Sequence, residues 1–386
     1  MSGTPDRLHL AIALDGTGWH PASWREPDAR PTELLTPGYW TDLVATAERG
    51  LLDFATIEDG LTLQSDHPLR ADNRTDRVRG RLDATLIASR VAPRTHHIGL
   101  IPTVIATHTE PFHASKAIAT LDYVSSGRAG IRVQVSASPV AAGHFGRRDV
   151  TRPGEVDDLL DEAADYVEVV RRLWDSWEDD AEIRDVATGR FIDRRKLHYI
   201  DFEGTRFSVK GPSITPRPPQ GQPIVAVLGH RQSVYELIAA SADVGFITPH
   251  DAPETTTLVD TIAAHRVAEE PVKVFADLVV FLDDTAAAAR TRRDRLDHVL
   301  GREYRSDAEI FVGTPTQLAD LLQQWQAAGA DGFRLRPATL PHDLLQITEG
   351  LVPELQSRGL FRTAYSAAIL RETLGLARPA NRYSTV

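Results

Sequence analysis

The sequence contains no cysteine, which excludes disulfide bonds, thiolate metal sites and cysteine nucleophiles. It also contains no apolar run of membrane-spanning length. The first residues, MSGTPDRLHLAIAL, carry too little basic charge and too short an apolar run for a signal peptide. We therefore expect a cytoplasmic protein that does not associate with a membrane.

Basic residues are outnumbered by acidic ones. Lys and Arg total 43 against 54 Asp and Glu, and the net charge is -11. This balance argues against a nucleic-acid binder, which needs a basic face to neutralise phosphates, but it is compatible with a local basic pocket for one phosphate. The hydrophobic share of 42% is ample for a core, so the 386 residues form one large α/β domain or two smaller domains.

Eight short apolar segments recur along the chain, and nearly every one is followed by a segment with helical periodicity. The predicted strands are residues 8–14, 52–58, 97–106, 131–136, 224–228, 244–248, 272–282 and 331–336. Eight βα units in sequence indicate a (β/α)₈ TIM barrel, an α/β fold. A doubly wound sheet is the alternative, and the lack of G-x-G-x-x-G after the first strand argues against it.

The chain is longer than a minimal barrel of roughly 250 residues, and insertions account for the excess. We predict a single barrel domain over residues 1–386, with insertions after strands one and four. The first is the Trp- and Pro-rich loop 15–38. The second, 178–223, contains two predicted hairpins, around Thr188-Gly189 and Glu203-Gly204. Residues 359–386 form a C-terminal extension whose mixed composition is compatible with packing on a neighbouring subunit.

The segment from His96 to Ser138 has the pattern of a strand, a helix and a second strand. Its second strand alternates, and Arg132, Gln134 and Ser136 share one face. In a parallel sheet that is covered on both sides, both faces are normally apolar. The polar face therefore indicates an active-site cavity.

Arg132 is the most informative single residue of this segment. Inside a barrel it must be paired, because an unpaired buried charge is very costly. Glu58, at the end of the second predicted strand, is the expected partner. The alternative interpretation is a structural ion pair that fills the barrel interior.

Other polar residues follow the strands at their carboxyl ends, where barrel enzymes place their active sites. The turn Gly229-His230-Arg231 opens a helix, so its backbone N–H groups and Arg231 can hold a phosphate; an ordinary βα turn is the alternative. Asp59 either accepts a hydrogen bond from a ligand or caps the following segment. His20 lies in the first loop, where a lone histidine is more often structural than catalytic.

Several catalytic signatures are missing. The sequence has no H-E-x-x-H, G-x-S-x-G or G-x-x-x-x-G-K, so zincin, α/β-hydrolase and P-loop functions lack support. His108 and His113 are five residues apart across a helix start, which is poor geometry for a shared metal. A metal-dependent barrel hydrolase needs clustered histidines and carboxylates, and the chain offers only scattered ones.

Longer segments of the chain resemble the bacterial-luciferase-like flavin monooxygenases. They are HIGLIPTVIATHTEPFHASKAIATLDYVSSGRAG, LWDSWEDDAEIRD, GRFIDRRKLHYIDFEGTRFSVKGPSITPRPPQGQPIV and FVGTPTQLADLL, and with GWHPASWREP and LLDFATIEDG they span most of residues 8–340. The branch most similar to them contains nitrilotriacetate, pristinamycin IIA synthase and dibenzothiophene-sulfone monooxygenases. That family has the (β/α)₈ fold, in agreement with the strand count.

The resemblance implies a two-component flavin-dependent monooxygenase. Reduced FMN would arrive from a separate NAD(P)H-dependent flavin reductase. It would react with O₂ to give a flavin C4a-peroxide, which oxygenates a small organic substrate. The resemblance further implies a homodimer or homotetramer.

The resemblance also assigns roles to particular positions. It implies cofactor contacts from Asp59, Thr103, Ser136, Gly229, His230 and Arg231, and a catalytic, proton-handling role for His20. Arg132 is our candidate for a catalytic cation near the flavin N1. The chain departs from the family pattern where Ile131-Arg132 replaces Trp-Asn, Leu160 replaces a Tyr, and His230-Arg231 replaces a pair of Ser.

Two alternatives remain within the same superfamily. One is an F420-dependent oxidoreductase, which transfers hydride and does not need O₂. The other is a relative in which the departures at Arg132, Leu160 and His230-Arg231 have cost flavin binding or catalysis.

Overall fold

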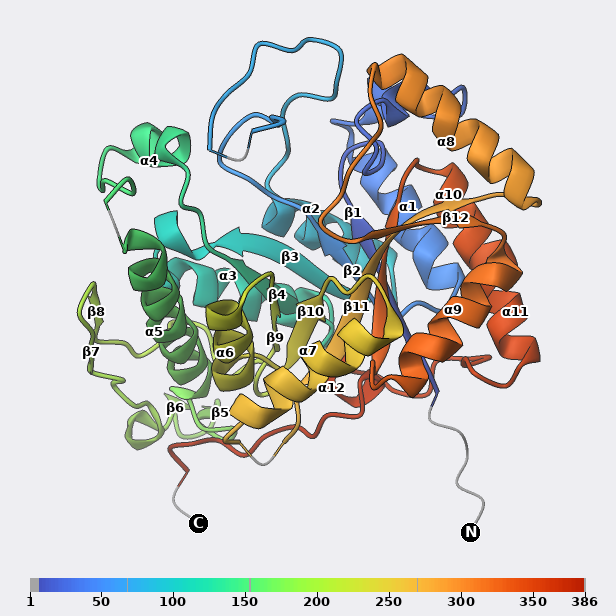
Figure 1. Cartoon of the computed structure of the whole chain (residues 1–386). Coiled ribbons are helices and arrows are strands. Elements are labelled where there is room, and N and C mark those ends of the chain that lie inside the picture. Colours follow the sequence, from blue (N-terminus) through green and yellow to red (C-terminus); the bar gives the residue numbers. More distant parts are fainter. Residues whose placement is uncertain (1–6, 68, 153, 269, 385–386) are drawn as a thin grey trace.

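The chain folds around a closed barrel of eight parallel strands that is surrounded by helices (Figure 1). The computed structural model describes residues 7–67, 69–152, 154–268 and 270–384. The barrel strands are β1 (His9–Leu14), β2 (Phe54–Ile57), β3 (Gly99–Ile105), β4 (Gly130–Gln134), β9 (Ile224–Leu228), β10 (Val244–Ile247), β11 (Lys273–Leu282) and β13 (Gly332–Pro337). They coincide with the eight predicted strands, so the predicted (β/α)₈ barrel is confirmed. The ends of the predicted domain range, 1–6 and 385–386, lie outside the described residues.

Each barrel strand pairs with the strand of the next βα unit, β10 pairs with β11, and β13 returns to β1 and closes the ring. The strands are apolar because helices cover their outer face and side chains fill the inside. In the described part of the chain, no helix is long and apolar enough to cross a membrane.

Helices follow the strands and pack on the outside of the barrel. They are α1 (Pro37–Arg49), α2 (Ala84–Val91), α3 (Pro111–Val124), α5 (Glu155–Asp175), α6 (Gln232–Ser241), α7 (Ala252–His265), α8 (Ala286–Leu300), α9 (Pro315–Ala327), α10 (His342–Leu345) and α11 (Val352–Ser357). The helical segment after β13 consists of α10 and α11 joined by a π-helical turn at Gln346–Leu351. Two short helices, α4 (Pro139–Phe145) and α12 (Leu370–Thr373), were not predicted.

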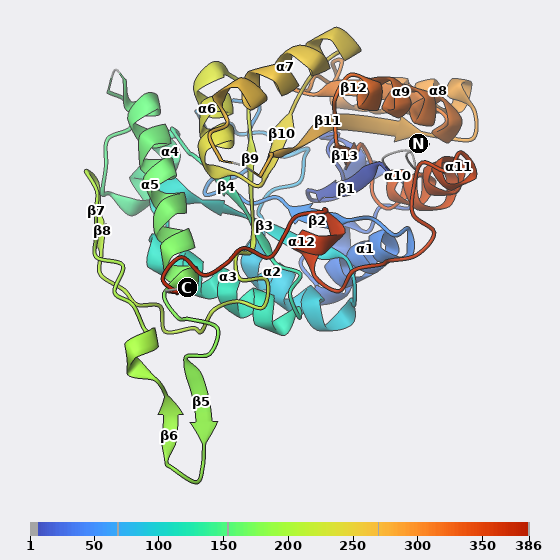
Figure 2. The same cartoon turned by 90° about the horizontal axis from the view of Figure 1, so that it is seen from below.

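The second insertion contains both predicted hairpins. They are formed by β5 (Glu182–Asp185) with β6 (Arg190–Ile192), and by β7 (Phe202–Glu203) with β8 (Ser208–Val209). The β5–β6 hairpin projects from the body of the molecule (Figure 2). A further strand, β12 (Glu309–Gly313), was not predicted; it pairs with the far half of β11 and lies outside the barrel ring.

The C-terminal extension crosses the end of the barrel at which the strands begin (Figure 2). Leu370 of α12 and Leu374, which directly follows this helix, are fully buried and join a cluster that contains Phe54 and Phe275 from the barrel strands. Gly99 makes room for this contact, since a Cβ there would lie 2.6 Å from Leu370. The extension therefore packs on its own barrel, where its leucines close the apolar end. Its packing on a neighbouring subunit stays a prediction.

Candidate active site

The main cavity of the barrel opens at the carboxyl ends of β4 and β9 and has a volume of about 380 Å³. One wall is apolar, with Val135, Leu160 and Val234 among its residues. Arg132 and Arg336 line the polar side. Its location agrees with the general rule that barrel enzymes bind their ligands at this face.

Arg132 lies at the base of this cavity and is almost fully buried. It forms the predicted ion pair with Glu58, and its Nε donates a 2.9 Å hydrogen bond to Thr103 Oγ1 on the neighbouring strand. Gln134 accepts a further hydrogen bond of 2.9 Å. Burial lowers the pKa of Arg132 to about 10, so the guanidinium remains a cation at neutral pH. The predicted pairing of Arg132 is confirmed, and its proposed role beside a flavin stays a prediction.

A second charged group fills the barrel beside this pair. Asp277 of β11 is fully buried and forms ion pairs with Arg334 and Arg336 of β13. Arg336 continues to Asp307, at 2.7 Å, and its guanidinium carbon lies 4.5 Å from the centre of the Trp19 ring. Asp277 was not among the predicted site residues, although it is an acidic residue within an apolar strand, which is a detectable signal.

Two residues of the turn Gly229-His230-Arg231, His230 and Arg231, line the cavity. The Gly229 N–H is already bonded to the Phe246 carbonyl at 2.9 Å, and a Cβ at Gly229 would lie 2.6 Å from the Tyr235 ring. Gly229 thus provides space, while His230 and Arg231 line the cavity at the start of α6. Burial lowers the pKa of His230, so its ring is neutral at pH 7.

Other predicted cofactor residues lie apart from this cavity. Asp59 and Thr103 line a neighbouring cavity of about 300 Å³. The Asp59 carboxylate accepts hydrogen bonds from the backbone N–H groups of Gly60, at 2.7 Å, and Ala84, at 2.9 Å, which is the capping role given above as the alternative. Ser136 does not line the main cavity; its backbone N–H donates to Thr107 Oγ1 at 2.9 Å.

His20 is fully buried in the first loop. Its Nδ1 accepts the Ala22 N–H at 3.1 Å, and its Nε2 lies 3.2 Å from Asp297 Oδ1. Burial lowers the pKa of His20 in spite of Asp297, so the neutral ring donates from Nε2. Both ring nitrogens therefore have protein partners, and proton handling by His20 stays a prediction.

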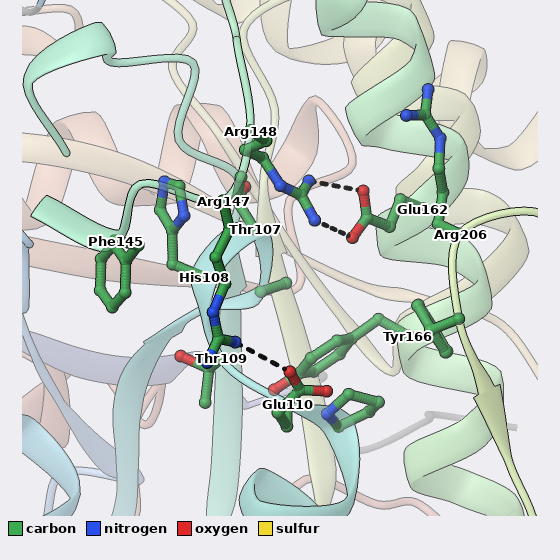
Figure 3. A pocket seen from close by; sticks show the side chains of 13 residues that line it. Thr107, His108, Thr109, Glu110, Phe145, Arg147, Arg148, Glu162, Tyr166 and Arg206 are labelled. Carbon is green, nitrogen blue, oxygen red and sulfur yellow. Dashed lines mark hydrogen bonds and ion pairs between the residues drawn. The ribbon is translucent and has the colours of Figure 1, made fainter. Parts of the chain in front are cut away.

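A further cavity, of about 140 Å³, lies outside the barrel between α4, α5 and the segment before α3 (Figure 3). Arg148 and Glu162 form a bidentate ion pair across it, and Arg147 reaches Glu110 at its edge. His108 stacks on Phe145 here, whereas His113 lines a different cavity. Among the residues that the structure describes, no three His, Asp or Glu side chains are placed to hold a metal ion.

The chain is thus a (β/α)₈ barrel with a polar cavity at the carboxyl ends of its strands, which is where enzymes of this fold have their active sites. The chain belongs to the luciferase-like monooxygenase family, whose model matches residues 19–332. It is 32% identical to N-acetyl-S-(2-succino)cysteine monooxygenase of Bacillus subtilis over 453 aligned positions that cover 100% of both chains. It is 29% identical to nitrilotriacetate monooxygenase component A of Aminobacter aminovorans, with 98% of each covered.

Among solved structures, long-chain alkane monooxygenase (LadA) superposes with a TM-score of 0.85, at 25% identity, over 96% of this chain and 95% of that one. The predicted family, barrel fold and monooxygenase class are thereby confirmed.

Proposed function

We propose that this chain is the oxygenase component of a two-component monooxygenase. It takes reduced FMN from a separate NAD(P)H-dependent flavin reductase and uses O₂ to oxygenate a small organic substrate. The observation that carries the proposal is the main cavity, which combines an apolar wall, a fixed cation at its base and a basic turn at a helix start. The names of the relatives, one of them a "component A", agree with a system of separate parts.

The residues present fit FMN. His230, Arg231 and the first N–H groups of α6 suit the phosphate, because a helix start attracts anions and an Arg can contact phosphate oxygens directly. Glu58 Oε1 is buried and has no hydrogen-bond partner among the described residues, although Arg334 lies 3.6 Å away. This oxygen lies where it can accept an N–H from a ring in the cavity.

Bound reduced FMN supplies the chemistry of O₂ activation, and the chain supplies orientation and electrostatics. Arg132 places positive charge at the base of the cavity, held in one position by Glu58 and Thr103. Asp307 holds Arg336 against Trp19, which closes one end of the cavity. The apolar wall limits the water that can reach the reacting atoms.

Anaerobic titration with reduced FMN, followed by a pulse of O₂, tests this proposal. We expect binding and then a persistent absorbance feature that differs from those of reduced and oxidised FMN. A parallel titration with reduced F420 tests the alternative cofactor. A folded sample that binds neither cofactor would contradict the proposal and favour a relative that has lost flavin binding.

The remaining properties are proposed from the family alone. We propose a cytoplasmic homodimer or homotetramer, and light scattering on the purified protein checks the oligomeric state. The reductase is expected to act by transfer of free reduced FMN. A coupled assay in which an unrelated flavin reductase replaces the natural one should therefore retain activity.

A further inference from the structure

A smaller chamber of about 170 Å³ lies beside the main cavity, between the first loop and the loop that follows β2. Trp19 lines both spaces. A void of about 10 Å³ shares Glu58 with the main cavity and Asp15 and Arg81 with the smaller chamber. The site therefore has two adjoining spaces, of which the larger suits the flavin. The smaller one is left for the substrate.

Arg77 is the distinctive residue of the smaller chamber. Its side chain is only 6% exposed, and its Nη2 donates to Asp66 at 2.6 Å. Its Nε is buried and has no hydrogen-bond partner within the described ranges. A buried donor without a partner is unfavourable, and Arg77 lines the chamber, so a ligand there that accepts a hydrogen bond would satisfy this donor.

The other polar groups of the chamber already have partners. Arg81 holds Asp15 through two hydrogen bonds of 3.1 and 2.5 Å, so this pair is neutral as a unit. Gln64 bonds to the backbone of Gly80 through both ends of its amide. His20 is neutral and bonded at both nitrogens. Among the described residues that line this chamber, Arg77 is thus the one with a buried side-chain nitrogen that lacks a hydrogen-bond partner.

We propose that Arg77 binds a carboxylate of the substrate, so that the enzyme oxygenates small organic acids. This inference rests on the proposed monooxygenase function. A guanidinium edge matches a carboxylate in charge and in geometry. Asp66 lies 2.6 Å and Asp72 3.9 Å from the Arg77 guanidinium, so their charges oppose a dianion such as phosphate more strongly than a monoanion. With its carboxylate on Arg77, the substrate extends past Trp19 towards the flavin.

Binding of matched ligands tests the inference without any variant. The probes are short aliphatic and aromatic monocarboxylates, each paired with its methyl ester and its primary amide, and Trp fluorescence or calorimetry reports binding. We expect at least one acid to bind about tenfold or more tightly than its ester, equivalent to about 1.4 kcal/mol. If no acid in the panel is preferred over its ester and amide, the inference is wrong.

The variant Arg77→Gln then assigns the preference to this residue. It should weaken the acid by about tenfold and leave the ester within about twofold, since only the charge-assisted bond is lost. Arg70→Gln, in the same loop but exposed, is the matched control and should change neither. An equal loss for acid and ester would overturn the role of Arg77.

Failure of this inference differs from failure of the proposed function. Arg77 lies outside the main cavity, so Arg77→Gln should bind reduced FMN and give the same response to O₂ as the wild type. If flavin never binds, the proposed function fails, and the preference for acids can still be measured on the flavin-free protein. If flavin binds and no acid is preferred, only the carboxylate inference fails.

Discussion

The two ends of the barrel are built from the same strands but filled with opposite kinds of side chain. At the end where the strands begin, Phe54, Phe246 and Phe275 meet the leucines in and directly after α12, and all are buried. In the next layer towards the carboxyl end, Arg334 and Asp277 are buried just as completely. Arg334 lies directly over the Phe246 ring, 4.0 Å from its centre, so the two layers touch.

This contrast indicates that the apolar layer mainly stabilises the fold, whereas the charged layer mainly serves the site. Apolar burial stabilises the fold by about 25 cal/mol for each Å² removed from water, whereas buried ion pairs roughly break even against hydrophobic residues of the same size. The charged layer is therefore not required to hold the barrel closed. Its position beside the main cavity, with Arg132 and Arg336 in the cavity wall, ties it to the chemistry of the site.

Removal of Asp277 should give the largest effect. Asp277→Ala leaves Arg334 and Arg336 buried without their shared carboxylate, and we expect a loss of about 3–5 kcal/mol in the free energy of unfolding. Denaturant unfolding measures this loss. Asp320→Ala, which removes a half-exposed partner of Arg358, is the control and should cost less than about 1 kcal/mol. A small loss in Asp277→Ala would show that the buried arginines find other partners.

The next largest effect should come from shortening Leu370, which belongs to the apolar cluster at the end of the barrel where the strands begin. Leu370→Ala opens a cavity between α12 and the barrel strands, and we expect a loss of about 3 kcal/mol. Leu35→Ala, at a side chain that is 63% exposed, should be nearly neutral. Reduced FMN should still bind to Leu370→Ala below its unfolding transition, because α12 lies at the far end of the barrel. Loss of flavin binding in the folded variant would contradict the separation of the two ends.

The two ends should also respond in opposite ways to pH. Asp122, near the start of β4, accepts hydrogen bonds from Gln220 and the Ala129 N–H, yet burial raises its pKa to about 6. Its folded-state pKa exceeds the unfolded value, so its contribution to stability is present in acid and lost as pH rises through about 6. Asp277 responds to pH in the opposite direction. Burial opposes its ionisation, but Arg334 and Arg336 lower its pKa, so its contribution to stability is lost as pH falls.

Asp122→Asn tests this sign. Between about pH 4 and about pH 7, the wild type should lose up to about 3 kcal/mol relative to the variant. The measurement is the difference in unfolding free energy at each pH, so any constant cost of the lost carboxylate cancels. Asp260→Asn, on the exposed face of α7, controls for net charge and should run parallel to the wild type. A difference that does not change with pH would show that Asp122 is ionised throughout.

The same contrast explains what the sequence could and could not predict. The barrel followed from eight apolar segments, because burial on both faces leaves a clear local pattern. The pair of Arg132 with Glu58 was accessible for the same reason, since a charge on a buried strand must find a partner. Asp277 carried the same signal, one acidic residue in an apolar strand, and its partners Arg334 and Arg336 lie on the paired strand β13. It could therefore have been predicted by the argument that was applied to Arg132.

The assignment of Asp59 and Ser136 to the flavin depended on family resemblance and not on spacing. In the structure the Asp59 carboxylate accepts a hydrogen bond from the Gly60 N–H, and the Ser136 N–H donates to Thr107 Oγ1. The packing of α12 on the barrel could not be predicted either, since a four-residue helix in an irregular tail has no periodicity to detect.

The smallest effect should come from the basic turn, which is the only part of the main cavity that we assign to phosphate. Arg231 is partly exposed and lies 3.4 Å from Asp157, so it has little to do with stability. Arg231→Gln should weaken FMN by about fivefold to tenfold and leave riboflavin unchanged, because riboflavin lacks the phosphate. Titration of the oxidised flavins by fluorescence measures both affinities, with Arg290→Gln on the exposed face of α8 as the control. Equal weakening of FMN and riboflavin would place Arg231 against the ring instead, and the orientation of the flavin in the cavity would then have to be reversed.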